Sequence, residues 1–145
     1  MSQHLVQQWY EKYKTGIFRF ALSVLKDSAL AEDVLQETFL KLLSGRYTVY
    51  EGKEQSWLYK VARNLCYDIL RNQDREVELD VSQSREQYGY IDLISGLNLT
   101  EREIVTLKIV GGLSHKEIAK VMGLTVHASK KRYERAIQKL REEET

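Results

Sequence analysis

Apolar side chains recur at three- and four-residue steps along most of this chain, which is the spacing that places them on one face of an α-helix. The pattern predicts helices over residues 3–26, from Asp27 or Ser28 to Gly45, over residues 54–72, from Thr100 to about Val110, over residues 114–123 and from Thr125 to about Arg141. The 145 residues include no proline, so the commonest helix breaker is absent from the sequence. We therefore expect an all-α fold.

Residues 73–89 interrupt this pattern, because they are acidic and polar and lack strong helical periodicity. The interruption predicts two small helical domains, residues 1–74 and residues 97–145, joined by a linker over residues 75–96. Because both domains are short, each is expected to bury only a modest core.

Two segments of the C-terminal domain carry the pattern of a capping box, in which Ser or Thr is followed three residues later by Glu. The pairs are Thr100 with Glu103 and Ser114 with Glu117. The second pair is followed by a short helix, Gly123 and a longer amphipathic helix whose inner face is expected to include Val126. This order predicts a helix-turn-helix, in which the N-terminal residues of the second helix enter the major groove of DNA.

The net charge of +1 conceals an uneven distribution, because residues 100–141 carry ten Lys and Arg against four Asp and Glu. A basic C-terminal third favours a polyanionic partner, although a solvated helical surface would carry the same charges. The candidate DNA contacts of this domain are Ser114, Lys116, Thr125, His127, Ala128, Lys130, Lys131 and Arg135.

The sequence offers little to support an enzyme. The histidines His4, His115 and His127 are scattered and lack metal-ligand spacing to one another or to Cys66. No glycine-rich phosphate loop or nucleophile elbow is present in the sequence. We therefore predict no enzymatic activity, no cofactor and no metal, and expect Cys66 to be a small buried hydrophobe.

The apolar runs are only a few residues long and the first residues contain no apolar leader segment, which predicts no membrane insertion. A single cysteine cannot form an internal disulfide and fits a reducing compartment. The expected location is therefore the cytoplasm.

Residues 99–142 resemble region 4 of the sigma-70 family. The matching positions are Thr100, Arg102, Glu103, Gly112, Ser114, Glu117, Ile118, Ala119, Arg135, Ala136, Leu140 and Arg141. The same pattern occurs in the output domains of response regulators. The chain departs from the family in its second helix, where the usual glycine, threonine and valine are replaced by His127, Ala128 and Ser129. The departure leaves open which −35 sequence is read.

The N-terminal half resembles region 2 of the extracytoplasmic-function (ECF, group 4) sigma factors. Residues 28–43, SALAEDVLQETFLKLL, are similar to their A-E-D-x-x-Q-E-x-F helix, and residues 56–71, SWLYKVARNLCYDILR, to their W-L-x-x-I-A-x-N-x-x-x-D-x-x-R helix. The resemblance implies a factor that binds core RNA polymerase, recognises −10 and −35 promoter elements and directs transcription initiation. It also implies control by an anti-sigma factor.

One polar ridge of the second helix is the candidate site for core RNA polymerase. Asp33, Gln36, Glu37 and Lys41 follow the i, i+3, i+4, i+8 spacing of one helix face. They lie opposite an apolar stripe that is expected to include Leu43. The resemblance assigns this ridge to the clamp helices of the β′ subunit, and it implies contact of region 4 with the β flap. An ordinary solvated face has the same spacing.

The third helix and the loop before it are the candidate −10 site. By resemblance, the contacts are Tyr47, Tyr50, Trp57, Lys60, Arg63, Asn64 and Arg71. Bases captured from an opened strand need stacking surfaces, base-edge hydrogen bonds and cations for the backbone. Trp57 fits either the core or a stacking wedge, and Asp68 fits either a base contact or an ion pair with Arg71.

Two further interpretations remain. The chain could be a sigma-like regulator that binds DNA or protein and needs a partner to initiate transcription. It could also be a simple DNA-binding protein of the response-regulator type, but that interpretation leaves the AEDVLQETF and WLYKVARN motifs unexplained.

Overall fold

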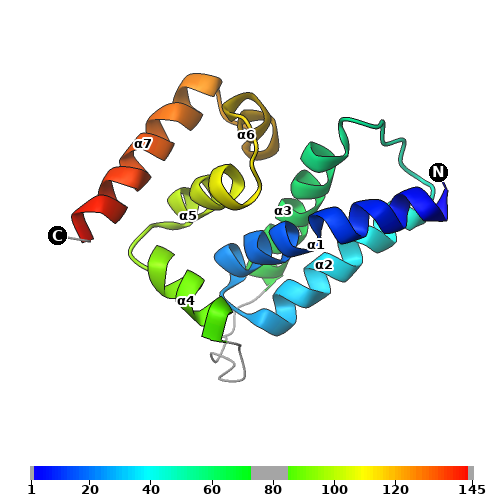
Figure 1. Ribbon diagram of the computed structural model, residues 1–145, viewed down its shortest axis with the longest axis horizontal. Coiled ribbons are helices and arrows are strands. Elements are labelled where there is room, and N and C mark those ends of the chain that lie inside the picture. The colour runs from blue at the N-terminus through cyan, green and yellow to red at the C-terminus, as the bar shows by residue number, and fades with distance from the viewer. Residues whose placement is uncertain (1, 73–84, 144–145) are drawn as a thin grey trace.

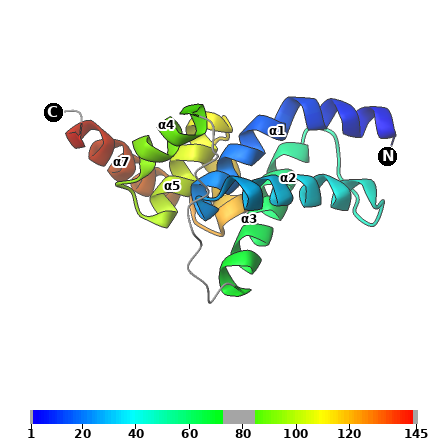
Figure 2. The same ribbon diagram turned by 90° about the horizontal axis from the view of Figure 1, so that it is seen from below.

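The computed structural model describes residues 2–72 and 85–143. Its elements are α1 (Gln3–Leu25), α2 (Ser28–Leu43), α3 (Glu54–Asn72), α4 (Arg85–Ile94), α5 (Leu99–Val105), a π-helical turn (Thr106–Val110), α6 (His115–Met122) and α7 (Val126–Glu143). Across both described ranges the regular structure is helical, which confirms the all-α prediction. The N-terminal helices gather at one end of the molecule and α7 lies at the other (Figures 1 and 2).

Helices α1 and α2 lie side by side, and α3 packs against both (Figure 1). The break between α1 and α2 is sharp because Lys26 adopts a left-handed conformation with φ of 54°. Asp27 then caps α2, accepting a hydrogen bond from the amide of Leu30 at 3.0 Å. The shared core is built from large side chains of all three helices, among them Trp9, Ile17, Phe20, Val34, Phe39, Leu42 and Leu58.

The prediction that the apolar stripe of α2 extends to Leu43 is wrong. Leu43 is 52% exposed, whereas Leu42 beside it is buried at 2%. Leu43 is the last residue of α2 and lines the groove between α1 and α2, so about half of its side chain faces solvent.

The start of α5 also differs from the prediction. Asn98, not Thr100, caps the helix, and it forms a capping box with Glu101. Both pairs have the required spacing of three residues, but the helix begins two residues earlier than expected. Glu103 therefore lies in the body of α5, where its side chain is fully buried.

Helices α6 and α7 form the predicted helix-turn-helix. The capping box of Ser114 and Glu117 is confirmed, and Gly123 ends α6 with φ of 69°. Thr125 starts α7 by accepting a hydrogen bond from the amide of Ala128 at 3.0 Å. The prediction that Val126 faces inward is wrong, because its side chain is 41% exposed. The packed face of α7 begins one turn later, at the buried Ser129.

A helix lies within the range that was predicted to be a linker. Residues 73–84 lie outside the described residues, but α4 extends over Arg85–Ile94. Ile94 and the following Leu97 are buried against Val105 and Ala136, which belong to α5 and α7. The second half of the predicted linker therefore packs both on the C-terminal helices and on α1.

The two groups of helices pack directly on each other. Helix α1 contacts α5 and the π-helical turn, and α3 contacts α6. Tyr59 of α3 lies at this boundary, with its ring edge-on to Phe20 at a centroid distance of 5.8 Å. A Cβ atom added to Gly111 would lie 3.1 Å from the Tyr59 hydroxyl and 2.8 Å from the carbonyl oxygen of Leu107. The backbone of the π-helical turn, together with Tyr59 from the other unit, therefore leaves no room for a side chain at this position.

Candidate functional site

The predicted ridge of α2 exists as one exposed surface. Asp33, Gln36 and Glu37 are exposed and Lys41 is half-buried, all on the side of α2 away from the core. The Gln36 amide donates to a carboxylate oxygen of Glu32 at 3.4 Å, one turn earlier. The structure thus brings together the four residues that the spacing grouped.

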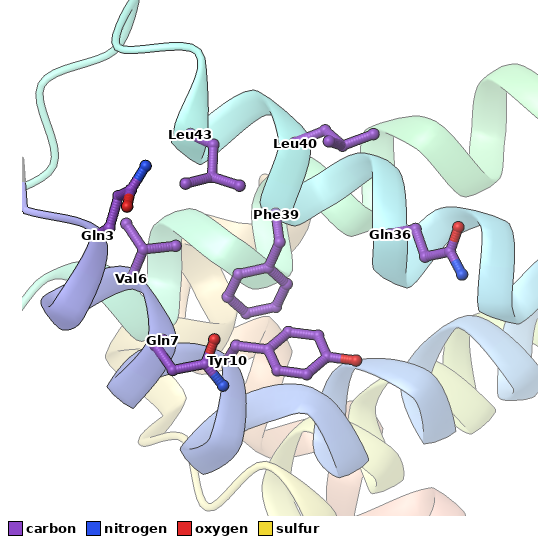
Figure 3. A pocket seen from close by; sticks show the side chains of 8 residues that line it. All are labelled: Gln3, Val6, Gln7, Tyr10, Gln36, Phe39, Leu40 and Leu43. Atoms are coloured by element: carbon purple, nitrogen blue, oxygen red, sulfur yellow. The ribbon is translucent and has the colours of Figure 1, made fainter.

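An apolar groove lies beside this ridge, between the start of α1 and the end of α2 (Figure 3). Its lining residues are Gln3, Val6, Gln7, Tyr10, Gln36, Phe39, Leu40 and Leu43. Leu40 is 57% exposed and stands one turn after Gln36, so it extends the ridge with an apolar side chain. The sequence analysis missed Leu40, although a leucine in register with a polar ridge is a signal of a contact surface.

The loop before α3 presents two aromatic rings. Tyr47 is 46% exposed and Tyr50 is 69% exposed. The ring of Tyr47 lies 5.7 Å from that of Trp57, between centroids, at a tilt of 56°. Trp57 is half-buried and packs partly against the core, so it belongs to the core and also supports the exposed Tyr47.

The predicted −10 residues of α3 differ in their exposure and in their partners. Lys60, Asn64 and Arg71 are exposed. Arg71 forms an ion pair with Asp68 one turn earlier, which is one of the two roles considered for Asp68. Arg63 behaves differently, because its guanidinium Nε donates to the Oε1 of Glu103 at 2.8 Å.

Glu103 is the centre of a polar cluster between α3 and α5. Its carboxylate is fully buried, and its Oε2 accepts a hydrogen bond from the Tyr67 hydroxyl at 2.8 Å. Burial is the larger influence on the pKa of Glu103 and raises it, against the opposing effects of Arg63 and Tyr67. Burial and the neighbouring carboxylate also raise the pKa of Tyr67 to about 12. Glu103, Arg63 and Tyr67 therefore depend on one another for their hydrogen-bond partners.

Other polar contacts cross the same boundary. The Gln55 side-chain amide donates to the carbonyl of Gly111, and Arg102 Nε donates to the carbonyl of Ser23 at 2.8 Å. The Ser56 hydroxyl donates to Glu117 at 3.4 Å. Together with the Glu103 cluster, these bonds hold the C-terminal helices against α1 and α3, next to the predicted −10 residues.

The candidate DNA contacts of the helix-turn-helix lie on its outer surface. Lys116 of α6 is exposed, as are His127, Lys130, Lys131 and Arg135 of α7, and Ala128 is half-buried. Ser114 and Thr125 are also exposed, but their hydroxyls cap α6 and α7. Their first role is therefore to fix the ends of these helices. Arg132, which the sequence analysis did not single out, lines a hollow with Arg135 and the start of α5.

Within the described residues, no group of three or more His, Cys, Asp or Glu side chains could hold a metal ion. Cys66 is buried as expected, and burial raises the pKa of its thiol to about 12. None of the described helices combines the length and the apolar character that crossing a membrane requires.

Comparison with known families explains this arrangement. Residues 9–76 match the family described as Sigma-70 region 2, and residues 90–140 match that described as Sigma-70, region 4. The chain is 30% identical to the ECF RNA polymerase sigma factor SigM of Bacillus subtilis (strain 168), over 94% of this chain and 93% of SigM. The chain belongs to the ECF family of RNA polymerase sigma factors.

Two solved structures share the fold of this ECF sigma factor. The sigma factor RpoE, in complex with the anti-sigma factor NepR from Bartonella quintana, matches with a TM-score of 0.76 and 21% identity over 94% of both chains. CnrH, in complex with the cytosolic domain of CnrY, matches with a TM-score of 0.72 and 24% identity over 96% of this chain and 86% of CnrH. Both matches cover α1 to α3 and the helix-turn-helix together.

The ECF sigma factor also contains polar contacts between its two regions that the sequence analysis missed. Glu103 and Arg102 were recognised only as motif residues, and Gln55 and Ser56 were not singled out. A signal for Glu103 is present in the sequence, because it lies one turn before Leu107 on a helix face that is otherwise apolar. A charged residue in that register indicates a buried partner, but the sequence does not identify the partner as Arg63.

Proposed function

We propose that this ECF sigma factor binds core RNA polymerase, recognises −10 and −35 promoter elements and directs transcription initiation. The observation that carries the proposal is that both sigma regions are present in order and that the candidate contact residues chosen from the sequence are all exposed or half-buried. The factor acts in the cytoplasm and has no enzymatic activity or cofactor of its own.

Core polymerase binds the α2 ridge in this proposal. Asp33, Gln36, Glu37 and Lys41 contact the clamp helices of the β′ subunit, and region 4 contacts the β flap. The neighbouring Leu40 adds apolar area to a surface that is otherwise polar. A polar rim beside an apolar patch is the usual composition of a protein interface.

The −10 element is read by α3 and the loop before it. Asn64 hydrogen-bonds a base edge, Lys60 and Arg71 hold the backbone, and Tyr47 and Tyr50 offer stacking surfaces supported by Trp57. The ion pair with Glu103 competes with DNA for the guanidinium of Arg63. We therefore propose that loss of this contact between region 4 and region 2 favours −10 binding.

The −35 element is read by α7 through His127, Ala128, Lys130, Lys131 and Arg135. Lys116 of α6 contacts the phosphate backbone, and Ser114 and Thr125 lie at the two helix starts that face the DNA. An anti-sigma factor is proposed as a further partner, because the sigma factor RpoE described above was solved in complex with the anti-sigma factor NepR.

The departure of α7 from the family at His127, Ala128 and Ser129 favours a second candidate function. A sigma-like regulator with an altered helix would need a partner to initiate transcription. In vitro transcription with purified core RNA polymerase and a library of promoter fragments separates the two functions. A complete initiation factor yields promoter-specific transcripts without further protein. Transcripts that appear only after a partner is added would support the second function.

A further inference from the structure

Ser129 is a buried polar residue at a position where the family usually has valine. Its side chain is fully buried, and its hydroxyl oxygen lies 2.8 Å from Nδ1 of His115. A buried hydroxyl without a partner destabilises a protein, whereas a paired one does not. The hydrogen bond to His115 therefore explains how α7 accommodates serine at this position.

His115 is well placed to orient α7. It is the first residue of α6, directly after the capping residue Ser114. Its ring also lies edge-on to Tyr133 of α7, with centroids 5.5 Å apart and planes at 65°. Ser129 and Tyr133 are four residues apart and share one face of α7, so the imidazole touches two successive turns.

The surroundings of His115 favour its neutral form. Burial lowers the pKa of the imidazole, and the positive charges of Lys108 and Lys130 lower it further, against the opposing effect of Glu134. A neutral imidazole carries one donor and one acceptor nitrogen, and either can pair with a hydroxyl. The bond to Ser129 can therefore form without a charge in the interior of the helix-turn-helix.

We propose that His115 and Ser129 are positioning residues for −35 recognition, and that their hydrogen bond fixes the rotation of α7 about its own axis relative to α6. The inference rests on the proposed reading of DNA by α7. Ser129 lies between Ala128 and Lys130, and His115 lies between Ser114 and Lys116, so the bond joins the two segments that carry the proposed DNA contacts. A valine at this position would pack by shape and tolerate small rotations of α7. A hydrogen bond is directional, so it restricts such rotations.

The test is a binding-site selection with the full chain and a DNA duplex library that contains a randomised segment. Ser129→Ala and His115→Ala each remove one partner of the bond, and the double variant removes both. Each single variant should weaken binding to the duplex that the unmodified protein selects by about fivefold, which is the value of one ordinary hydrogen bond. Each should also broaden the selected sequence, and the double variant should be no worse than either single one. His115→Gln, which retains a hydrogen-bonding side chain, should recover part of the preference.

Thr106→Val is the matched control. Thr106 is also fully buried; its hydroxyl donates to the carbonyl of Arg102 at 2.8 Å and also pairs with the Tyr90 hydroxyl, and neither partner belongs to α6 or α7. This variant should lower the melting temperature and leave the selected sequence unchanged. If Ser129→Ala and His115→Ala select the original sequence with unchanged affinity, or if Thr106→Val broadens it equally, the positioning role is overturned while DNA reading stands. If the unmodified protein selects no sequence, the proposed −35 reading itself fails, and the positioning role fails with it.

Discussion

The Nε atom of Arg63 and the Oε1 atom of Glu103 lie 2.8 Å apart, although the two residues belong to different sigma regions. Glu103 is fully buried and Arg63 retains 23% exposure of its side chain. The Glu103 carboxylate therefore pairs with a guanidinium that is also a proposed −10 contact. One ion pair thus couples the packing of the two regions to the availability of a proposed DNA contact.

Replacing Glu103 should loosen the contact between the two regions. Glu103→Ala leaves Arg63 and Tyr67 without their shared acceptor, which should cost about 1–3 kcal/mol, less than a fully buried pair because Arg63 is partly exposed. Small-angle X-ray scattering of the free protein should show a larger radius of gyration. Asp68→Ala is the control, because it breaks the exposed ion pair with Arg71 and should leave the shape unchanged. Equal radii for all three proteins would contradict the coupling.

Reversing charge on the α2 ridge should weaken the binding of core RNA polymerase. Asp33→Lys and Glu37→Lys change two exposed carboxylates, so folding stability should change by no more than about 0.5 kcal/mol for each. Affinity for core can be measured by fluorescence titration, with circular dichroism to verify helicity. Asp92→Lys makes the charge change of one such substitution on the exposed surface of α4 and serves as the control for each single variant and for the double variant. The ridge assignment would be wrong if the folded double variant bound core as tightly as the control.

Substitutions at two leucines of α2 should affect core binding and folding stability separately. Leu42 is buried at 2%, so Leu42→Ala should lower the free energy of unfolding by about 2–5 kcal/mol. Leu40 is 57% exposed, so Leu40→Ala should have little effect on unfolding but reduce core affinity. Urea unfolding and core titration of both variants measure the two effects. A Leu40→Ala protein with full core affinity would exclude Leu40 from the interface.

Asn64 and Lys60 should differ in how they affect −10 binding. Asn64→Ala removes a proposed base contact and should relax the preference at one position of the element. Lys60→Ala removes a proposed phosphate contact and should weaken all sequences alike, with a shallower dependence on salt concentration. Binding of single-stranded −10 variants over a series of salt concentrations tests both. A uniform loss with Asn64→Ala would remove its base-reading role.

The capping carboxylate of Glu117 should make stability depend on acid pH. Burial alone would raise the pKa of Glu117, but hydrogen bonds from the amide and hydroxyl of Ser114 outweigh it and lower the pKa. The unfolded chain then binds the proton more readily, so this contribution is present above the ordinary pKa of glutamate and is lost as the pH falls through the lowered value. Glu117→Gln should therefore flatten the fall in unfolding free energy on acidification. An unchanged acid profile would show that the cap contributes nothing.

The sequence by itself determined the features that depend on near neighbours. The capping box of Ser114 and Glu117, the left-handed turn at Gly123 and the ridge of α2 each depend only on residues within one helix or its ends, so their spacing was sufficient. The two sigma motifs were recognisable for the same reason, because each occupies a single helix.

Tertiary structure decided what depends on residues far apart in the chain. Asn98 with Glu101 and Thr100 with Glu103 have the same capping spacing, and the fold used the first pair while Glu103 paired with Arg63, forty residues away. Likewise, Leu42 and Leu43 are equally apolar, and only the packing of α2 among the other helices makes one core and the other surface. Burial is a property of the surrounding helices, because a side chain is removed from water only by the atoms that cover it.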